Sequence, residues 1–368
     1  MSHSRRTWIR QTSLTVAALG IGKVLTAAPE WRQSNPTGKV ILLNSNENPF
    51  GPAPSVVQAM SAAAGKSNRY SDDEVKDLIR KLSSFQQVAP ENIIMSAGSS
   101  EILGQTTLMA AQKGGNVVTA EPSFNPWTRL GKEFGLKIKS IPVDKDYKLD
   151  LDKMRSAIDG ETRMVYVCNP NNPVGNNIEF EKLKSFVEEC SAKCLVLVDE
   201  AYTEFAELPS MAGIAVKNKN IIVAKTFSKI YGLAGARIGY AIAHPETIRK
   251  FEALQSWPNG QLGQVNVAGA LAALDDQAFV KSCRDKTKEC REYCYDSFKK
   301  LNLTYIPSVT SFMLFNIEPI KCDYQASMEK ENIMVQYRNH FGGKWCRVSM
   351  GTMEEMKAFV NVLGHMCS

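Results

Sequence analysis

The sequence lacks the features that mark several large classes of protein. Its apolar stretch near the amino terminus, Leu14 to Ile21, is much shorter than the roughly 20 apolar residues that a transmembrane helix needs. The chain has no internal repeat, no low-complexity tract, and no cluster of Lys and Arg interleaved with aromatic residues of the kind that binds nucleic acid. We therefore expect neither a stable membrane anchor nor a nucleic-acid partner.

The nine cysteines lack the paired spacing of a metal-binding motif, so no metal is expected. Cys283, Cys290 and Cys294 recur at helical spacing, and Cys190 and Cys194 lie where a helix pattern meets a strand pattern. A disulfide or a metal ligand is the alternative in an oxidising compartment. The simpler prediction is a set of buried thiols without a chemical role.

The positive charge of the chain is concentrated at its amino terminus. Residues 1–28 contain four basic residues and no acidic one, so subtracting these four charges from the formal +6 leaves +2 for the rest. The paired Arg5 and Arg6, the apolar stretch and the small residues near Ala28 resemble a twin-arginine export signal, although Lys23 interrupts the apolar region. We expect a signal peptide over 1–28 and a periplasmic protein. A frayed basic tail on a cytoplasmic protein is the alternative.

A chain of 368 residues is long enough for two domains. Over 54–257, apolar strand patterns alternate with amphipathic helix patterns, for example 54–64, 100–111, 150–157 and 179–189. This order is typical of an α/β domain whose mostly parallel sheet is covered on both faces. The seven expected strands of this large domain are Ile93–Ser96, Asn116–Ala120, Lys137–Pro142, Met164–Cys168, Leu195–Asp199, Ile221–Lys225 and Ile238–Ala243.

A smaller α+β domain is expected over 258–368, and an extended arm over 29–53 precedes the large domain. The mixed order of helix and strand patterns after Pro258 is the basis for this division. A loop is expected over 337–344. The remaining expected elements are one long helix over 264–300, strands near 303–306, 312–317, 333–336 and 345–349, and a final helix over 353–363.

Residues with chemically useful side chains follow the predicted strands, which is where sites lie in open α/β sheets. Each has an ordinary structural explanation, such as a helix cap for Asp199, a core position for Tyr202 and a solvated charge for Lys229. Their joint occurrence in strand order favours one shared site. The candidates are Gly98, Ser99 and Ser100, whose N–H groups could hold a phosphate, and Phe124, Asn172, Asp199, Tyr202, Thr226, Ser228, Lys229 and Arg237.

A series of motifs runs through most of the chain. They are NENPFGP at 46–52, RY at 69–70, GSSE at 98–101, NNPVG at 171–175, DEAY at 199–202, SK at 228–229, AGARIG at 234–239 and CRVSMGT at 346–352. In this combination the sequence resembles the fold type I aminotransferases, and within them the histidinol-phosphate aminotransferase branch, over 39–365. The resemblance implies pyridoxal 5'-phosphate as cofactor and a homodimer with shared active sites. The implied reaction moves an amino group between an amino acid, or an amino-alcohol phosphate such as histidinol phosphate, and a 2-oxo acid.

The resemblance also implies roles for the candidate residues. Lys229 carries the cofactor as a Schiff base and moves the substrate proton. Asp199 keeps the pyridine nitrogen protonated, while Tyr202 and Asn172 bind the phenolic oxygen and Phe124 stacks on the ring. The implied phosphate ligands are the turn at Gly98, Ser99 and Ser100, the side chains of Thr226, Ser228 and Arg237, and Tyr70 of the partner subunit.

The acidic group of the substrate is expected to bind Arg347, with Asn46 and Arg338 also at the substrate site. The family commonly has an arginine where this chain has Gln336. Either Arg338 replaces it through a shifted register, or one phosphate ligand is lost. We therefore expect amino acids with a carboxylate to be preferred to histidinol phosphate.

Two other functions are alternatives to amino-group transfer. A decarboxylase or other lyase would share every cofactor contact and differ only in which substrate bond is aligned with the ring. An exported binding protein with a degenerate fold would be expected to lack Lys229 or Asp199, and the chain has both.

Overall fold

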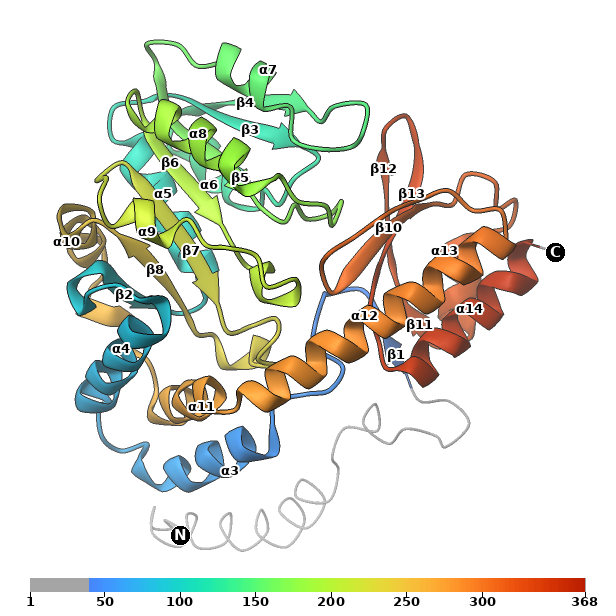
Figure 1. Cartoon of the computed structure of the whole chain (residues 1–368), viewed down its shortest axis with the longest axis horizontal. Coiled ribbons are helices and arrows are strands. Elements are labelled where there is room, and N and C mark those ends of the chain that lie inside the picture. The colour runs from blue at the N-terminus through green and yellow to red at the C-terminus, as the bar shows by residue number, and fades with distance from the viewer. Residues whose placement is uncertain (1–39, 368) are drawn as a thin grey trace, which may run out of the picture. The chain divides into compact units, whose positions relative to one another are not determined.

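The computed structural model describes residues 40–367 (Figure 1). The predicted signal peptide over 1–28 and most of the predicted arm lie outside the described residues. In the described part, no helix is both long and apolar enough to cross a membrane, and no cluster of potential metal ligands is present. All nine cysteines are free, and those outside the interior are Cys322 and Cys367.

A seven-stranded sheet forms the centre of the large domain, in the order β2-β8-β7-β6-β5-β3-β4. Strand β8 runs antiparallel to both of its neighbours, and the other strand pairs are parallel. The predicted mostly parallel sheet is thus confirmed. Its strands are β2 (Ile93–Ser96), β3 (Gly115–Glu121), β4 (Leu136–Pro142), β5 (Thr162–Cys168), β6 (Leu195–Asp199), β7 (Ile221–Thr226) and β8 (Gly239–Ala243).

Helices cover both faces of this sheet, so its central strands are buried on two sides and their sequences are nearly continuous apolar runs. Alternate strand residues belong to two different cores: Val196 and Val223 to one, Leu197 and Ala224 to the other. The first core includes residues of α3 (Pro54–Ala63), α4 (Asp72–Gln86), α7 (Leu151–Ser156), α8 (Phe180–Ser191), α9 (Ala212–Ala215) and α11 (Gln264–Asp275). The second includes residues of α5 (Ser99–Ala111), α6 (Trp127–Glu133) and α10 (Pro245–Leu254).

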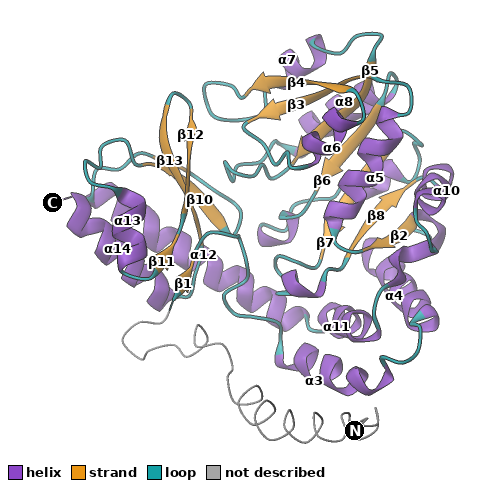
Figure 2. Cartoon of the chain, turned by 180° about the vertical axis from the view of Figure 1, so that it is seen from behind, coloured by secondary structure: helices purple, strands orange, loops and turns teal. Residues whose placement is uncertain are grey.

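A second, antiparallel sheet forms the small domain, in the order β12-β13-β10-β9. Helices α12, α13 and α14 lie beside it (Figure 2). The main chain after β1 joins this region, because Leu43 donates its N–H to the carbonyl of Met334. The elements are β9 (Tyr305–Ile306), β10 (Phe312–Asn316), β12 (Gln336–His340), β13 (Gly343–Ser349), α12 (Gln277–Lys300), α13 (Tyr324–Lys330) and α14 (Met353–Cys367), with the short strands β1 (Ile41–Leu42) and β11 (Ile333–Met334).

The prediction of one helix over 264–300 is wrong. The chain forms two helices, α11 and α12, which are separated at Asp276. The carboxylate of Asp276 accepts a hydrogen bond from the N–H of Phe279 and so caps the start of α12. Helix α11 packs against α3 and α4 of the large domain.

The prediction of a loop over 337–344 is also wrong, because β12 and β13 form a hairpin here. The turn contains Phe341 and Gly342, both with positive φ. Strand β12 lies at the edge of its sheet, so its polar sequence needs no buried apolar face. For this reason the sequence shows no strand pattern there.

Candidate active site

The carboxyl ends of the central strands line a cavity of about 260 Å³. The parallel topology brings together residues that are far apart in the sequence. The predicted site residues in the cavity wall are Asn46, Ser99, Ser100, Phe124, Asn172, Asp199, Tyr202, Thr226, Ser228, Lys229, Arg237 and Arg347.

Asp199 is buried at the end of β6. Its Oδ2 accepts a 2.9 Å hydrogen bond from the hydroxyl of Tyr166, and its Oδ1 accepts a 3.2 Å bond from the N–H of Ala201. Burial raises the pKa of Asp199 to about 6, against the lowering effect of these bonds and of the Lys229 charge. The carboxylate is therefore fixed in place and ionised at neutral pH.

Tyr166 is a site residue that the sequence analysis missed. It lies in the middle of β5, where a tyrosine is normally explained by packing alone. The available signal was a phenol group between the apolar residues Val165 and Val167 of a buried strand, because a buried hydroxyl usually has a hydrogen-bond partner.

Lys229 follows β7, and its ammonium donates a 3.3 Å hydrogen bond to the carbonyl of Ser45. Burial lowers the pKa of Lys229 to about 8, and the nearby charge of Arg347 contributes in the same direction. A lysine with this pKa is partly neutral near pH 7, so its amine can act as a nucleophile.

Tyr202 lies beside Lys229, with the lysine Nζ 5.8 Å from the centre of the tyrosine ring. The Tyr202 hydroxyl accepts hydrogen bonds from the side-chain amides of Asn46 at 3.0 Å and Asn172 at 3.5 Å. Asn46 is in turn held by Ser349, which bonds both its N–H and its side-chain oxygen. Both amides thus orient one phenol group toward the cavity.

The predicted phosphate ligands Gly98, Ser228 and Arg237 lie close together at the start of α5. Gly98 has a φ of 83°, and Arg237 also has a positive φ, of 53°. A Cβ atom at Gly98 would overlap the guanidinium of Arg237, so glycine is needed for this close approach. Arg237 also bonds Ser228 at 3.4 Å. A helix start, a guanidinium and hydroxyl groups together fit a phosphate.

Arg347, on β13, forms the opposite wall of the cavity. Its terminal nitrogens donate to Asn172 Oδ1 at 2.9 Å, the Asn44 carbonyl at 2.7 Å and Gln336 Oε1 at 3.1 Å. All three acceptors are neutral. The Nε atom is buried and has no hydrogen-bond partner in the part of the chain that the structure describes. No acidic side chain forms an ion pair with Arg347 in the described residues, so its charge is available to an acidic ligand.

A second cavity of about 360 Å³ adjoins the first, and Arg347 and Gln336 line both. Arg338 and His340 line the second cavity, because alternate residues of β12 share one face with Gln336. Burial lowers the pKa of His340, and the charges of Arg338 and Arg347 add to this effect. Arg338 is therefore a cavity residue and not a loop charge.

Tyr70, another predicted site residue, lines neither cavity. It is 84% exposed. Its predicted role concerns the active site of a second subunit, and that role stays a prediction.

The arrangement offers a reactive amine, an acid for a ring nitrogen, a phenol, an anion-binding corner and an arginine for a substrate acid. These groups fit pyridoxal phosphate, since each chemical feature of that cofactor has a matching group in the cavity wall.

Comparisons with known proteins agree with this geometry. The family model "Aminotransferase class I and II" matches residues 38–363. A histidinol-phosphate aminotransferase of Brevibacillus brevis is 36% identical over 330 residues, which cover 88% of this chain and 90% of that protein. One from Halalkalibacterium halodurans is 35% identical over 321 residues, 86% of each chain. The crystal structure of histidinol-phosphate aminotransferase from Sinorhizobium meliloti in complex with pyridoxal-5'-phosphate has a TM-score of 0.81 and 29% identity, covering 89% of this chain and 90% of that one.

Proposed function

This chain belongs to the class I and II aminotransferase family and is a pyridoxal-phosphate-dependent aminotransferase, and we propose that its preferred amino donor is an amino acid with a second carboxylate. The bound cofactor supplies an electron sink for the electrons left when the substrate loses a proton. Asp199 would hold the ring nitrogen, Tyr202 and Asn172 the phenolic oxygen, and the Gly98–Arg237 corner the phosphate. Lys229 would carry the cofactor and move the substrate proton.

The observation that carries the donor proposal is the position of two arginines on one face of the β12–β13 hairpin. Arg347 is the cross-strand partner of Gln336, and Arg338 is two residues further along β12. The Cα atoms of diagonal neighbours of this kind are roughly 7–8 Å apart. Such a pair suits a substrate with two separate acidic groups, one for each guanidinium.

For the second acidic group of the donor we expect a carboxylate and not a phosphate ester. Glu121 lines the same cavity as Arg338, and it would repel the second charge of a phosphate. The neutral Gln336 leaves Arg338 as the additional cation beside Arg347. We therefore keep the expectation that amino acids are preferred to histidinol phosphate, the donor in the names of the relatives described above.

A donor panel tests this proposal. Purified holoenzyme is assayed with L-glutamate, L-alanine and histidinol phosphate in direct competition, and we expect the highest kcat/KM for the dicarboxylic donor. Arg338→Gln should reduce that value roughly 10- to 100-fold, the effect of one lost charge-assisted hydrogen bond, and leave alanine almost unaffected. Arg249→Gln, on the exposed side of α10, is the matched control. A higher kcat/KM for histidinol phosphate would overturn the proposal, and released carbon dioxide would indicate a lyase.

Export to the periplasm and a homodimer with shared active sites are further parts of the proposal. The paired Arg5 and Arg6 followed by an apolar stretch support export. The family relationship and the exposed Tyr70 support the shared sites.

A further inference from the structure

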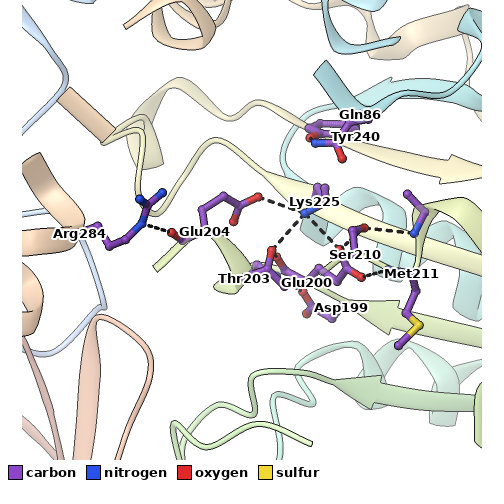
Figure 3. Close-up of polar contacts among 12 residues, drawn as sticks. Gln86, Asp199, Glu200, Thr203, Glu204, Ser210, Met211, Lys225, Tyr240 and Arg284 are labelled. Atoms are coloured by element: carbon purple, nitrogen blue, oxygen red, sulfur yellow. Dashed lines mark hydrogen bonds and ion pairs between the residues drawn. The ribbon is translucent and has the colours of Figure 1, made fainter. Parts of the chain in front are cut away.

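A buried lysine lies behind the active site, on the other side of the sheet. Only 4% of the Lys225 side chain is exposed. Its ammonium is 3.1 Å from each of three oxygens, which belong to Glu200, Thr203 and Glu204 (Figure 3). The contacts with Thr203 and Glu204 are hydrogen bonds, and the contact with Glu200 is an ion pair.

The partners of Lys225 are sequence neighbours of residues that line the cofactor cavity. Glu200 follows Asp199, Thr203 follows Tyr202, and Lys225 itself precedes Thr226. Lys225 and Thr226 are consecutive residues of β7, so their side chains point to opposite faces of the sheet. The cluster does not line the cavity. It connects the immediate sequence neighbours of cavity-lining residues on the opposite face of the sheet.

The cluster is held firmly at its margins. Glu200 accepts hydrogen bonds from the hydroxyl of Ser210 at 2.6 Å and the N–H of Met211 at 2.7 Å. The carbonyl of Glu204 accepts a 2.8 Å bond from Arg284 of α12. Figure 3 shows that Lys225 contacts Glu200, Thr203 and Glu204, and that these glutamates are bonded in turn by Ser210, Met211 and Arg284.

Stability alone does not explain such a cluster. Replacing a buried ion cluster by well-packed apolar residues is often neutral or stabilising. A reactive amine is also excluded, because the charges of Glu204 and Glu200 raise the pKa of Lys225 against the effect of burial. Lys225 therefore stays protonated, in contrast to Lys229.

We propose that Lys225 is a positioning residue for amino-group transfer: it fixes the turn that carries Asp199 and Tyr202 against the end of β7 that carries Thr226. In this way one ammonium sets the relative positions of groups at the ring nitrogen, the phenolic oxygen and the phosphate. The inference concerns the family reaction and is independent of the donor.

Lys225→Met in the holoenzyme tests the proposal with whichever donor is turned over fastest. We expect kcat to fall about 100-fold, the effect of a misplacement of about 1 Å, while the KM of the donor changes much less. Lys225→Arg keeps the charge and the donors and should restore most of the loss. Lys139→Met is the matched control, because it removes the Lys139–Asp159 ion pair from the same domain, away from the cavity, and should leave kcat unchanged.

A folded Lys225→Met holoenzyme with wild-type kcat would overturn the proposal. If that variant does not fold, Thr203→Val removes one acceptor and keeps every charge. It should then lower kcat by a smaller factor without a matching rise in KM. A Thr203→Val enzyme with unchanged kcat would refute the proposal equally.

Discussion

The hydroxyl of Tyr166 donates a 2.9 Å hydrogen bond to Asp199 Oδ2, and both side chains are buried, with Asp199 in the wall of the cavity. Strand β5 thus supplies the group that orients the acid at the end of β6. The bond favours the ionised carboxylate, whereas burial favours the protonated one and raises the pKa to about 6.

Tyr166→Phe should therefore raise the pKa of Asp199 above about 6. Because the ionised carboxylate is needed to hold the protonated ring nitrogen, cofactor binding should then fail at a higher pH as the solution is acidified. The measurement is the cofactor dissociation constant of the apoenzyme across pH 5 to 8. If cofactor affinity falls at the same pH in the wild-type protein and in Tyr166→Phe, this role of Tyr166 is contradicted.

The lowered pKa of Lys229 predicts how the apoenzyme captures the cofactor. Only the neutral amine attacks an aldehyde, so the capture rate should rise with pH and level off above about 8, well below the ordinary lysine value. Stopped-flow absorbance measures this rate. Lys229→Ala should bind the cofactor without a covalent bond and lose transamination by several orders of magnitude. Borohydride reduction and peptide mapping check the site: an adduct on another lysine would refute the assignment.

Gly98→Ala should weaken cofactor binding, because the added Cβ would displace Arg237 and the backbone has a φ of 83°. We expect at least a 10-fold rise in the dissociation constant, about the effect of one lost charge-assisted hydrogen bond. Gly104→Ala, on the same helix, is the control, since its Cβ would make an ordinary 3.6 Å contact with Leu130. Equal affinities in the two variants would exclude the steric explanation.

The predicted shared site can be tested by complementation. Mixing Tyr70→Phe with Lys229→Ala protein should give heterodimers in which one site carries both changes and the other neither. Activity should then exceed that of either parent. If subunits exchange and both parents are impaired, but no activity returns, Tyr70 does not serve a neighbouring site.

The predicted export depends on Arg5 and Arg6. Changing both to lysine preserves the charge but should block transport, because such signals are read by a receptor. Cell fractionation with an antibody to the enzyme measures the outcome. A variant that still reaches the periplasm would show that the pair is not an export signal.

The sequence was sufficient to predict the large sheet and most of the polar residues at the carboxyl ends of its strands. Buried parallel strands are apolar on both faces, so they are visible as runs, and the carboxyl ends of such strands must meet. This is why Asp199 and Lys229 could be placed in one site before the structure was considered.

Other features depend on information that the local sequence does not carry. Tyr166 reaches Asp199 because Cys168 of β5 pairs with Asp199 of β6. The sequences of the two strands do not determine this register. Lys225 directly follows the apolar residues of β7, and its partners Glu200, Thr203 and Glu204 come from the separate segment after β6. The break at Asp276 lies between two good helix patterns, where only the cap distinguishes two helices from one.

Helix α12 connects the two sheets as a single rod (Figure 1). Its 24 residues span roughly 36 Å. Arg284, near its start, is bound to Glu204 and Glu207 of the large domain, whereas Cys290 and Arg291 bond Gly351 and Thr310 of the small domain. A helix resists bending, so α12 should move as one rigid body, and any closure of the β12–β13 hairpin over a substrate should change the contacts at one of these two anchors and leave the helix between them intact.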